Sequence, residues 1–422
     1  MMDTIVIRGG RPLEGEVAVS GSKNAALPLI FSTLLTGERC VIKNVPMLAD
    51  VATALQVLRH LGARAQRSPD GHEVIIEARD IACSEAPYEL VKTMRASFLV
   101  LGPLLARFGR ARVSTPGGCA IGARPVDFHL VGLQRLGVQL RINEGYVEAQ
   151  AERLRGAKIL LDFPSVGATQ QLLMAGALAE GTTVIENAAR EPETVCLALA
   201  LERMGASIRG AGTSEITIEG RPELAGAVHT VIPDRIEAGT YLVAGAMTGG
   251  AVRVAGARAD HLEAFTGKLR EAGVVVTESE NGVRVEPDGP LRAVDVRTMP
   301  YPGFPTDLQA QFMSLMTRAT GTSTLTETIF ENRFLHAQEL VRMGADVRVD
   351  GNRAVVRGPQ RLSGAPVMAT DLRASVCLVL AGLAARGTTR VSRVYHLDRG
   401  YERVEAKLSA LGADVVRETR RS

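Results

Sequence analysis

The sequence predicts a two-domain, inside-out α/β barrel, in which six repeats of about 70 residues place apolar helices inside and sheets outside. Two repeated features predict this fold: a short amphipathic helix ending in glycine occurs six times, and a more apolar helix precedes each copy. The length adds a third, because one core rarely grows past about 300 residues. The 422 residues therefore divide into two sets of three repeats.

The glycine-terminated helices recur at nearly constant spacing. Their last residues are Gly62, Gly137, Gly205, Gly273, Gly344 and Gly412, at intervals of 75, 68, 68, 71 and 68 residues. Each glycine is predicted to follow its helix in the left-handed conformation. The stretch after each helix, such as residues 345–349, alternates apolar and polar residues and predicts a strand.

The second helix of each repeat is apolar around most of its circumference, which indicates burial in a core. The six stretches are residues 25–35, 97–106, 171–179, 240–247, 309–316 and 375–385. We expect the chain to cross between the two sets of repeats near residues 230–234. The opening strands, residues 4–7 and 17–19, precede the first apolar helix. The pattern leaves open which of the two sets of repeats they complete.

Composition and charge exclude several classes of protein. Aromatic residues make up 4%, tryptophan is absent and the net charge is +3, so a nucleic-acid partner is not expected. Apolar segments are too short to span a bilayer, and the first residues lack a signal-peptide pattern. The five cysteines are odd in number and far apart, which indicates a reducing cytoplasm and no disulfide framework or zinc site.

Cations stand where apolar helices begin. Lys23, Arg95 and Arg373 occupy equivalent repeat positions there, although the positive end of a helix dipole disfavours a cation. A bound anion would reconcile both, since helix N-termini and cations converge on phosphate and carboxylate groups. The alternative is that these side chains are solvated or paired with Asp307 and Asp371. The three together favour an anion site.

Residues 116–127 form the most unusual segment, within the longest repeat interval. Three glycines surround Cys119, which predicts a mobile loop that presents a thiol, and Arg124 would lower the pKa of that thiol. The alternative is an inert cysteine in a surface turn. We assign the other four cysteines, and His60 and His129, to structure. Motifs of nucleotide-driven, dinucleotide, zinc-protease and serine-hydrolase chemistry are absent from the sequence.

Seven segments together resemble the enolpyruvyl transferase family over essentially the whole chain. They are residues 21–26, 92–97, 116–127, 304–307, 331–334, 369–375 and 398–403. The resemblance implies transfer of the enolpyruvyl group of phosphoenolpyruvate to the 3-hydroxyl of UDP-N-acetylglucosamine by addition and elimination, with release of phosphate. The resemblance implies that this is the first committed step of peptidoglycan synthesis and that it needs no metal or cofactor. The only partners expected are these small molecules, without an obligate protein partner or a membrane.

The resemblance also implies domains and residue roles. One domain, residues 22–231, carries the cysteine loop at 114–128, and the other combines residues 1–21 and 232–422; the two close on the substrates. Cys119 would protonate the phosphoenolpyruvate methylene and react with epoxides such as fosfomycin. Asp307 would take the hydroxyl proton or stabilise the cationic intermediate, and Asp371 would assist closure or proton transfer. Lys23 would act at the donor as well.

Further residues are implied to hold the substrates. Those expected to bind phosphate and carboxylate are Lys23, Arg124, Arg373 and Arg399. Those expected to hold the nucleotide sugar are Asn24, Arg95, Arg124, Pro125, Val126, Asp127, Phe128, Ser165, Val166, Gly167, Asp307, Ile329 and Arg333.

Three other functions are alternatives to this transfer. A sister enzyme acting on shikimate 3-phosphate shares the repeats and the donor but lacks the glycine-rich cysteine loop. An RNA 3′-phosphate cyclase needs a nucleotidylated histidine, for which the sequence offers no site. A repeat scaffold without activity does not explain charges confined to the ends of buried helices.

Overall fold

The computed structural model describes residues 2–92, 94–115 and 126–420. These residues form two compact units. The central unit contains residues 21–115 and 126–232, and the terminal unit contains residues 2–20 and 233–420. The terminal unit is therefore built from both ends of the chain.

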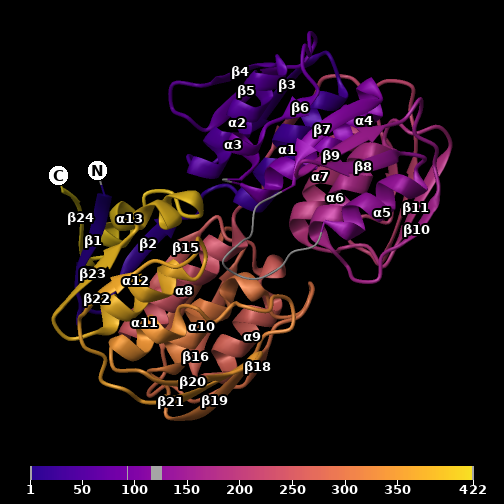
Figure 1. The fold of residues 1–422 in the computed structure, drawn as a ribbon. Helices are drawn as coiled ribbons and strands as arrows, with labels where there is room; N and C mark the ends of the chain where they lie inside the picture. The colour runs from indigo at the N-terminus through magenta and orange to yellow at the C-terminus, as the bar shows by residue number, and fades with distance from the viewer. Residues whose placement is uncertain (1, 93, 116–125, 421–422) are drawn as a thin grey trace. The chain divides into compact units, whose positions relative to one another are not determined.

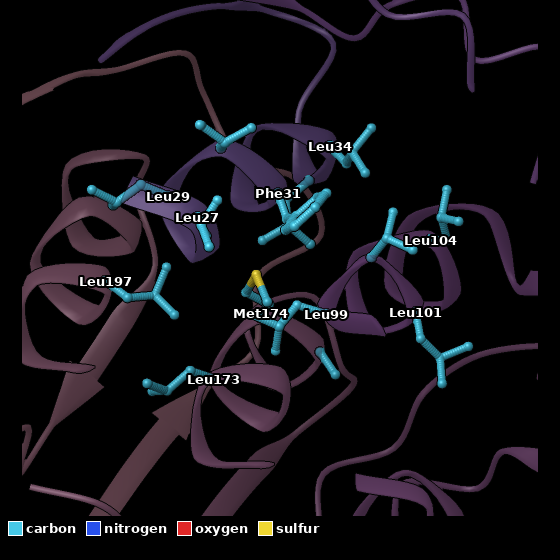
Figure 2. Packing of buried hydrophobic residues seen from close by; sticks show 14 of the residues in the cluster. Leu27, Leu29, Phe31, Leu34, Leu99, Leu101, Leu104, Leu173, Met174 and Leu197 are labelled. Carbon is cyan, nitrogen blue, oxygen red and sulfur yellow. The ribbon is translucent and has the colours of Figure 1, made fainter. Parts of the chain in front are cut away.

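Three buried helical segments fill the interior of the central unit. They are α1 (Lys23–Ser32) with η1 (Thr33–Leu35), η2 (Arg95–Val100) with α4 (Leu101–Phe108), and α6 (Val166–Gly176). The more amphipathic α2 (Ala49–Leu61), α5 (Asp127–Arg135) and α7 (Pro192–Arg203) follow them, and α3 (Tyr88–Val91) is a single turn. Leucines, Phe31 and Met174 from these helices converge in one core, each contributing about 1.5–3 kcal/mol by burial (Figure 2).

The described strands of the central unit form three sheets of four. The first has the order β14 (Val228–Thr230), β3 (Arg39–Lys43), β5 (Glu73–Glu77), β4 (Arg64–Arg67). The second has the order β6 (Glu85–Ala86), β7 (Arg110–Ser114), β9 (Tyr146–Gln150), β8 (Gln139–Asn143). The third has the order β10 (Lys158–Leu160), β11 (Thr182–Glu186), β13 (Glu215–Glu219), β12 (Ser207–Arg209). In each, the first pair is parallel and the others are antiparallel.

The terminal unit repeats this plan. Its interior helices are α8 (Arg235–Thr248), α10 (Gln309–Met316), preceded by η4 (Thr306–Leu308), and α12 (Ser375–Ala384). These three contact one another, and strands surround them (Figure 1). The amphipathic set is α9 (Glu263–Glu271), α11 (Ala337–Arg342) and α13 (Val404–Ala410), with η3 (Ala259–His261) and η5 (Val394–Arg399) before α9 and α13.

Its strands, within the described residues, again form three sheets of four. One has the order β2 (Gly15–Ala18), β15 (Val252–Ala255), β17 (Gly282–Pro287), β16 (Val274–Ser279). Another has the order β18 (Val296–Arg297), β19 (Gly321–Thr326), β21 (Arg353–Gly358), β20 (Asp346–Asp350). The last has the order β22 (Pro366–Met368), β23 (Thr388–Ser392), β1 (Met2–Arg8), β24 (Asp414–Arg420). The opening strands thus belong to the terminal unit, and β1 pairs with β23 and β24 in antiparallel register.

The predicted fold class is confirmed, with helices inside and sheets outside in each unit. All six repeat glycines have positive φ, between 86° and 108°, as predicted. Three interior helices begin two to five residues earlier than their apolar runs, because Ser22, Ser165 and Asp234 cap them with side-chain oxygens. In the part of the chain that the structure describes, the helices are too short or too polar to cross a membrane.

Candidate active site

Asp307, Arg333 and Arg373 come together in the terminal unit, where all three belong to the predicted site. Asp307 lies in η4, at the start of the interior helix α10. Arg333 Nη2 donates to its Oδ1 at 2.7 Å, and Arg373 Nε lies 3.7 Å from its Oδ2. Both arginines are 2% exposed, whereas the Asp307 side chain is 23% exposed. The accessible member of this cluster is therefore the carboxylate.

A second carboxylate holds Arg373 from the other side. Arg373 Nη2 donates to Asp234 Oδ2 at 3.4 Å, and Nη1 donates to the Gly400 carbonyl at 3.1 Å. Its Nε–H has no hydrogen-bond partner among the described residues. One buried donor of Arg373 is thus left for a ligand or for a closer approach of Asp307.

The two arginines stay charged in this cluster. Burial alone would lower the pKa of each, but the neighbouring groups outweigh it. Asp234, Tyr401 and Asp307 raise the pKa of Arg373 above its ordinary value, and Asp307, Asp371 and Glu327 do so for Arg333. Alternating carboxylates and guanidiniums therefore form a nearly neutral buried chain, in which neither sign is isolated.

Neutral side chains support the backbone beneath Asp307. Gln311 Nε2 donates to the Asp307 carbonyl and to Tyr401 Oη, both at 3.0 Å. Tyr401 Oη also lies 3.0 Å from Thr240 Oγ1. Burial raises the pKa of Tyr401 to about 12, so it stays a phenol at neutral pH. These contacts hold η4 against α8 through groups that carry no charge.

Asp371 serves the start of α12. Its Oδ1 accepts from the backbone N–H groups of Arg373 at 2.8 Å and Ala374 at 2.7 Å. The adjacent His336 is fully buried, and both of its ring nitrogens lack hydrogen-bond partners among the described residues. Burial lowers the pKa of His336 to about 4, although Asp371 opposes that change. The carboxylate predicted to assist catalysis thus also fixes the backbone that carries Arg373.

Lys23 is a buried cation of the predicted site in the central unit. It is the first residue of α1, directly after the cap Ser22, and it is 6% exposed. Its Nζ lies 3.3 Å from Asp50 Oδ2 on α2, and Asp50 is itself 3% exposed. Asp50 provides the negative charge that a cation at a helix N-terminus needs. The neighbouring Asn24 is half-buried on the same turn.

Arg95 and His129 lie near Gly167 at a second site in the central unit. The His129 ring meets Phe98 edge to face, with centroids 5.4 Å apart. Burial and then Arg95 lower the pKa of His129 to about 4. A Cβ at Gly167 would lie 2.9 Å from His129 Nε2, so only glycine leaves this ring in place. The imidazole therefore faces the first turn of α6 as a neutral group.

The remaining predicted binding residues lie near helix starts or in turns. Ser165 caps α6 through a 3.3 Å hydrogen bond from Ala168 N, and Val166 follows it. Val126 precedes α5, whose first residues are Asp127, exposed, and Phe128, half-buried. In the terminal unit, Ile329 and Arg399 are half-buried, and Arg399 ends η5. Cys119, Arg124 and Pro125 lie outside the described residues.

The other cysteines fit the structural assignment. Cys40, Cys196 and Cys377 are buried, and Cys83 is half-buried; all four are free thiols. Burial raises the pKa of Cys40 and Cys377, and that of Cys196 to about 11. These thiols are poor nucleophiles. Within the described ranges, no group of three or more His, Cys, Asp or Glu side chains is placed to hold a metal ion.

Two interpretations of the helix-end cations need correction. Lys23 is the first residue of α1, whereas Arg373 lies two residues before the first residue of α12, so the two cations stand at different places relative to their helices. The ion-pair alternative is partly right, because Arg373 lies beside Asp307 and Lys23 beside Asp50. The cations are thus already balanced by buried carboxylates, and an anionic ligand would join existing pairs.

Sequence analysis missed four residues that organise these sites. Asp50, Asp234 and Glu327 were not singled out, and His129 was assigned to structure. His129 is the third residue of α5, two residues after Asp127, and that place in the first turn could have signalled it. Asp50, Asp234 and Glu327 give no such signal, because the side chains that they bind here are 21 to 139 residues away in sequence.

Comparisons with known proteins agree with this geometry. The model of the family EPSP synthase (3-phosphoshikimate 1-carboxyvinyltransferase) matches residues 7–408. Relatives from Geobacter metallireducens and Trichlorobacter lovleyi, both named UDP-N-acetylglucosamine 1-carboxyvinyltransferase, are 57% identical over 416 and 421 residues, 99% of each chain.

Solved structures give the same picture. The enolpyruvyl transferase NikO from Streptomyces tendae is 29% identical, with a TM-score of 0.90 over 100% of both chains. An EPSP synthase from Acinetobacter baumannii has a TM-score of 0.75 over 99% of this chain and 100% of that one. At 17% identity, that second likeness shows the fold alone.

Proposed function

This chain belongs to the EPSP synthase family of enolpyruvyl transferases, and we propose that it transfers the enolpyruvyl group of phosphoenolpyruvate to the 3-hydroxyl of UDP-N-acetylglucosamine, releasing phosphate. The observation that carries this is the 57% identity, over 99% of both chains, to relatives named for that reaction. The product is the first intermediate committed to peptidoglycan. The substrates are small molecules, and the enzyme works in the cytoplasm.

The reaction proceeds by addition and elimination. A proton is delivered to the methylene carbon of phosphoenolpyruvate while the sugar hydroxyl attacks the adjacent carbon and loses its own proton. Loss of phosphate and of one methyl proton then restores the double bond. Cys119 is assigned the first proton transfer, and Asp307 accepts the hydroxyl proton or stabilises the developing cation. The partial exposure of Asp307 and its two buried arginine neighbours support this role.

The cations bind the anionic groups of the donor. Lys23, Arg124, Arg373 and Arg399 are assigned to its phosphate and carboxylate. The Nε–H of Arg373, which has no hydrogen-bond partner among the described residues, supports this assignment, because a carboxylate or phosphate oxygen would satisfy a buried donor. Asp371 positions Arg373 through the backbone of the turn before α12, which supports a part for Asp371 in closure on the substrates or in proton transfer.

The nucleotide sugar is assigned to residues near helix starts and in turns. Asn24, Arg95, Arg333 and Ile329 orient it, together with residues 124–128 and 165–167. The first turn of α6 supports this, because its cap is neutral and Gly167 adds no side chain. An uncharged helix start of this kind can bind the hydrogen-bonding and aromatic groups of a ligand without burying another charge.

The alternative acceptor is shikimate 3-phosphate, which the name of the matching family model contains. Phosphate release from phosphoenolpyruvate, measured with each acceptor in separate assays, distinguishes the two. We expect turnover with UDP-N-acetylglucosamine and none above background with shikimate 3-phosphate. The reverse result would overturn the proposal. A Cys119→Asp variant should keep activity, because a carboxylic acid also delivers a proton, and should resist alkylation by fosfomycin.

A further inference from the structure

A buried carboxylate outside the predicted site, Glu327, joins the segments that carry Asp307 and Arg333. Glu327 is 2% exposed and follows β19. Its Oε2 accepts from Thr306 Oγ1 at 2.8 Å. Its Oε1 accepts from Thr298 Oγ1 at 2.8 Å and from two backbone N–H groups, those of Ile329 at 2.8 Å and Phe330 at 3.2 Å. Four donors from three separate segments thus meet on one side chain.

These contacts close a ring around the site. Thr306 directly precedes Asp307 in η4. Phe330 lies three residues before Arg333, and the Arg333 guanidinium sits 5.1 Å from the Phe330 ring centroid. Arg333 in turn donates to Asp307 at 2.7 Å. The ring therefore runs from Glu327 through Thr306 and Asp307 to Arg333, and back through Phe330.

We propose that Glu327 is a positioning residue for the transferase reaction, which fixes the distance between the Asp307 carboxylate and the Arg333 guanidinium. This inference rests on the proposed function. Glu327 makes no contact with substrate in this role and acts only through Thr306 and the backbone of residues 329–330. Its importance lies in its length and geometry, because the four donors arrive at fixed places on its two oxygens.

Two substitutions at Glu327 separate geometry from charge. Glu327→Asp keeps the charge but withdraws the carboxylate by one methylene, and we expect kcat to fall on the order of 10²-fold, the cost of about 1 Å of misplacement. Glu327→Gln keeps the length. Its carbonyl can serve the three donors at Oε1 while its amide donates to Thr306, whose hydroxyl also accepts. We expect this variant to stay within about tenfold of the parent kcat.

Thr306 tests the link to Asp307 by itself. Thr306→Val keeps the shape but removes the hydroxyl, and Thr306→Ser keeps the hydroxyl. We expect kcat to fall about tenfold in Thr306→Val while the KM values change little, and Thr306→Ser to restore most of it. A loss confined to KM, or the same kcat in both variants, would overturn the positioning role.

Glu237 is the matched control. It is also 2% exposed in the terminal unit, and it accepts from Lys407 Nζ at 2.7 Å and Ser20 N at 2.6 Å rather than from the segments that carry Asp307 and Arg333. Glu237→Asp should lower the melting temperature while kcat stays unchanged. If Glu237→Asp reduced kcat as much as Glu327→Asp, the effect would be general destabilisation, and the inference would fail.

Hydrogen exchange separates this inference from the proposed function. The amides of Ile329 and Phe330 should exchange about tenfold faster in Glu327→Asp than in the parent, while Glu327→Gln preserves their protection. This readout needs no turnover. A parent protein inactive with UDP-N-acetylglucosamine would overturn the proposed function alone, whereas unchanged exchange of these amides would overturn the role of Glu327.

Discussion

The starts of α6 and α12 occupy matching places in the third repeats of the two units, yet they are built for different ligands. Ser165 caps α6, and Asp371 plays the same part in the turn that leads into α12: the side chain of each accepts from the N–H three residues on, and the carbonyl of each accepts from the N–H four residues on. Two residues after Ser165, α6 has Gly167, and two residues after Asp371, the turn before α12 has Arg373. The same backbone geometry thus presents a neutral, open turn in the central unit and a charged, crowded one in the terminal unit.

The neighbours of these two turns extend the contrast. Gly167 faces the neutral imidazole of His129. Arg373 lies between Asp234, which is buried, and Asp307, whose side chain is 23% exposed. The repeat therefore supplies a common anchoring device, a capped helix start, and substitutions in its first turn decide what it binds. A charged turn suits phosphate and carboxylate groups, and a neutral turn suits a nucleotide sugar.

The sharpest test of the charged end is Asp307→Asn. The amide keeps an oxygen that accepts from Arg333 but cannot take a proton or balance a cation at neutral pH. We expect kcat to fall by about 10²–10⁴-fold, the range for a positioned acid–base group. Circular dichroism should show an unchanged fold. A variant with nearly full turnover would show that Asp307 takes no part in the chemistry. The contrast between the two helix starts would then have no bearing on catalysis.

Acid should destabilise the regions around the starts of both α6 and α12, since each holds a neutral histidine. Folding lowers the pKa of His336 and of His129 from 6.5 to about 4. The stability that the two neutral histidines give the folded state is complete above pH 6.5. It is lost as the pH falls from 6.5 towards 4, because the unfolded chain binds protons that the folded chain does not. A shift of this size is worth up to about 3 kcal/mol for the buried His336.

Melting temperatures between pH 7.5 and 4.5 check this expectation. His336→Asn and His129→Asn should each flatten the decline, because each removes one titrating group. An identical pH profile in the parent and both variants would show that other groups control the acid transition.

Gly167→Ala tests the neutral end. The added methyl meets the His129 ring at 2.9 Å, so the ring must shift. We expect the KM for UDP-N-acetylglucosamine to rise about tenfold with little change in kcat, since this change disturbs binding more than the reacting groups. Gly267→Ala on α9 is the control, because nothing lies within 4 Å of its new methyl. It should leave KM unchanged and gain up to about 1 kcal/mol of helix stability.

The caps give the smallest effect and the most direct comparison of the two ends. Ser165→Ala should cost about 1 kcal/mol of unfolding free energy, and Asp371→Ala about 2 kcal/mol, because the carboxylate accepts from two N–H groups rather than one. Urea unfolding measures both. Ser22→Ala, which removes a neutral cap at α1, should match Ser165→Ala. Equal losses for Ser165→Ala and Asp371→Ala would mean that the charge of the second cap adds nothing.

Much of this architecture was predictable because its signals are local. The repeat glycines predicted helix ends in the left-handed conformation, and apolar runs such as residues 309–316 predicted buried helices. The predicted helix starts were less accurate: α8 begins at Arg235 rather than near Thr240, because the cap Asp234 extends the helix back past the charged residues Arg235 and Glu237. Of the site, Asp307, Arg333 and Arg373 were identified together through family resemblance, and the structure brings all three into contact.

The amino-acid sequence by itself determined the repeat, the sheets and helices of each copy, and the residue types at each helix start, because these depend on spacings of a few residues. Only the tertiary structure decided which donor each buried carboxylate faces. Asp234 lies 139 residues from Arg373, and Glu327 lies 21 residues from Thr306, so no local pattern connects them. Such pairs arise when separate helix starts and turns pack together, and burial then requires each charge to have a partner.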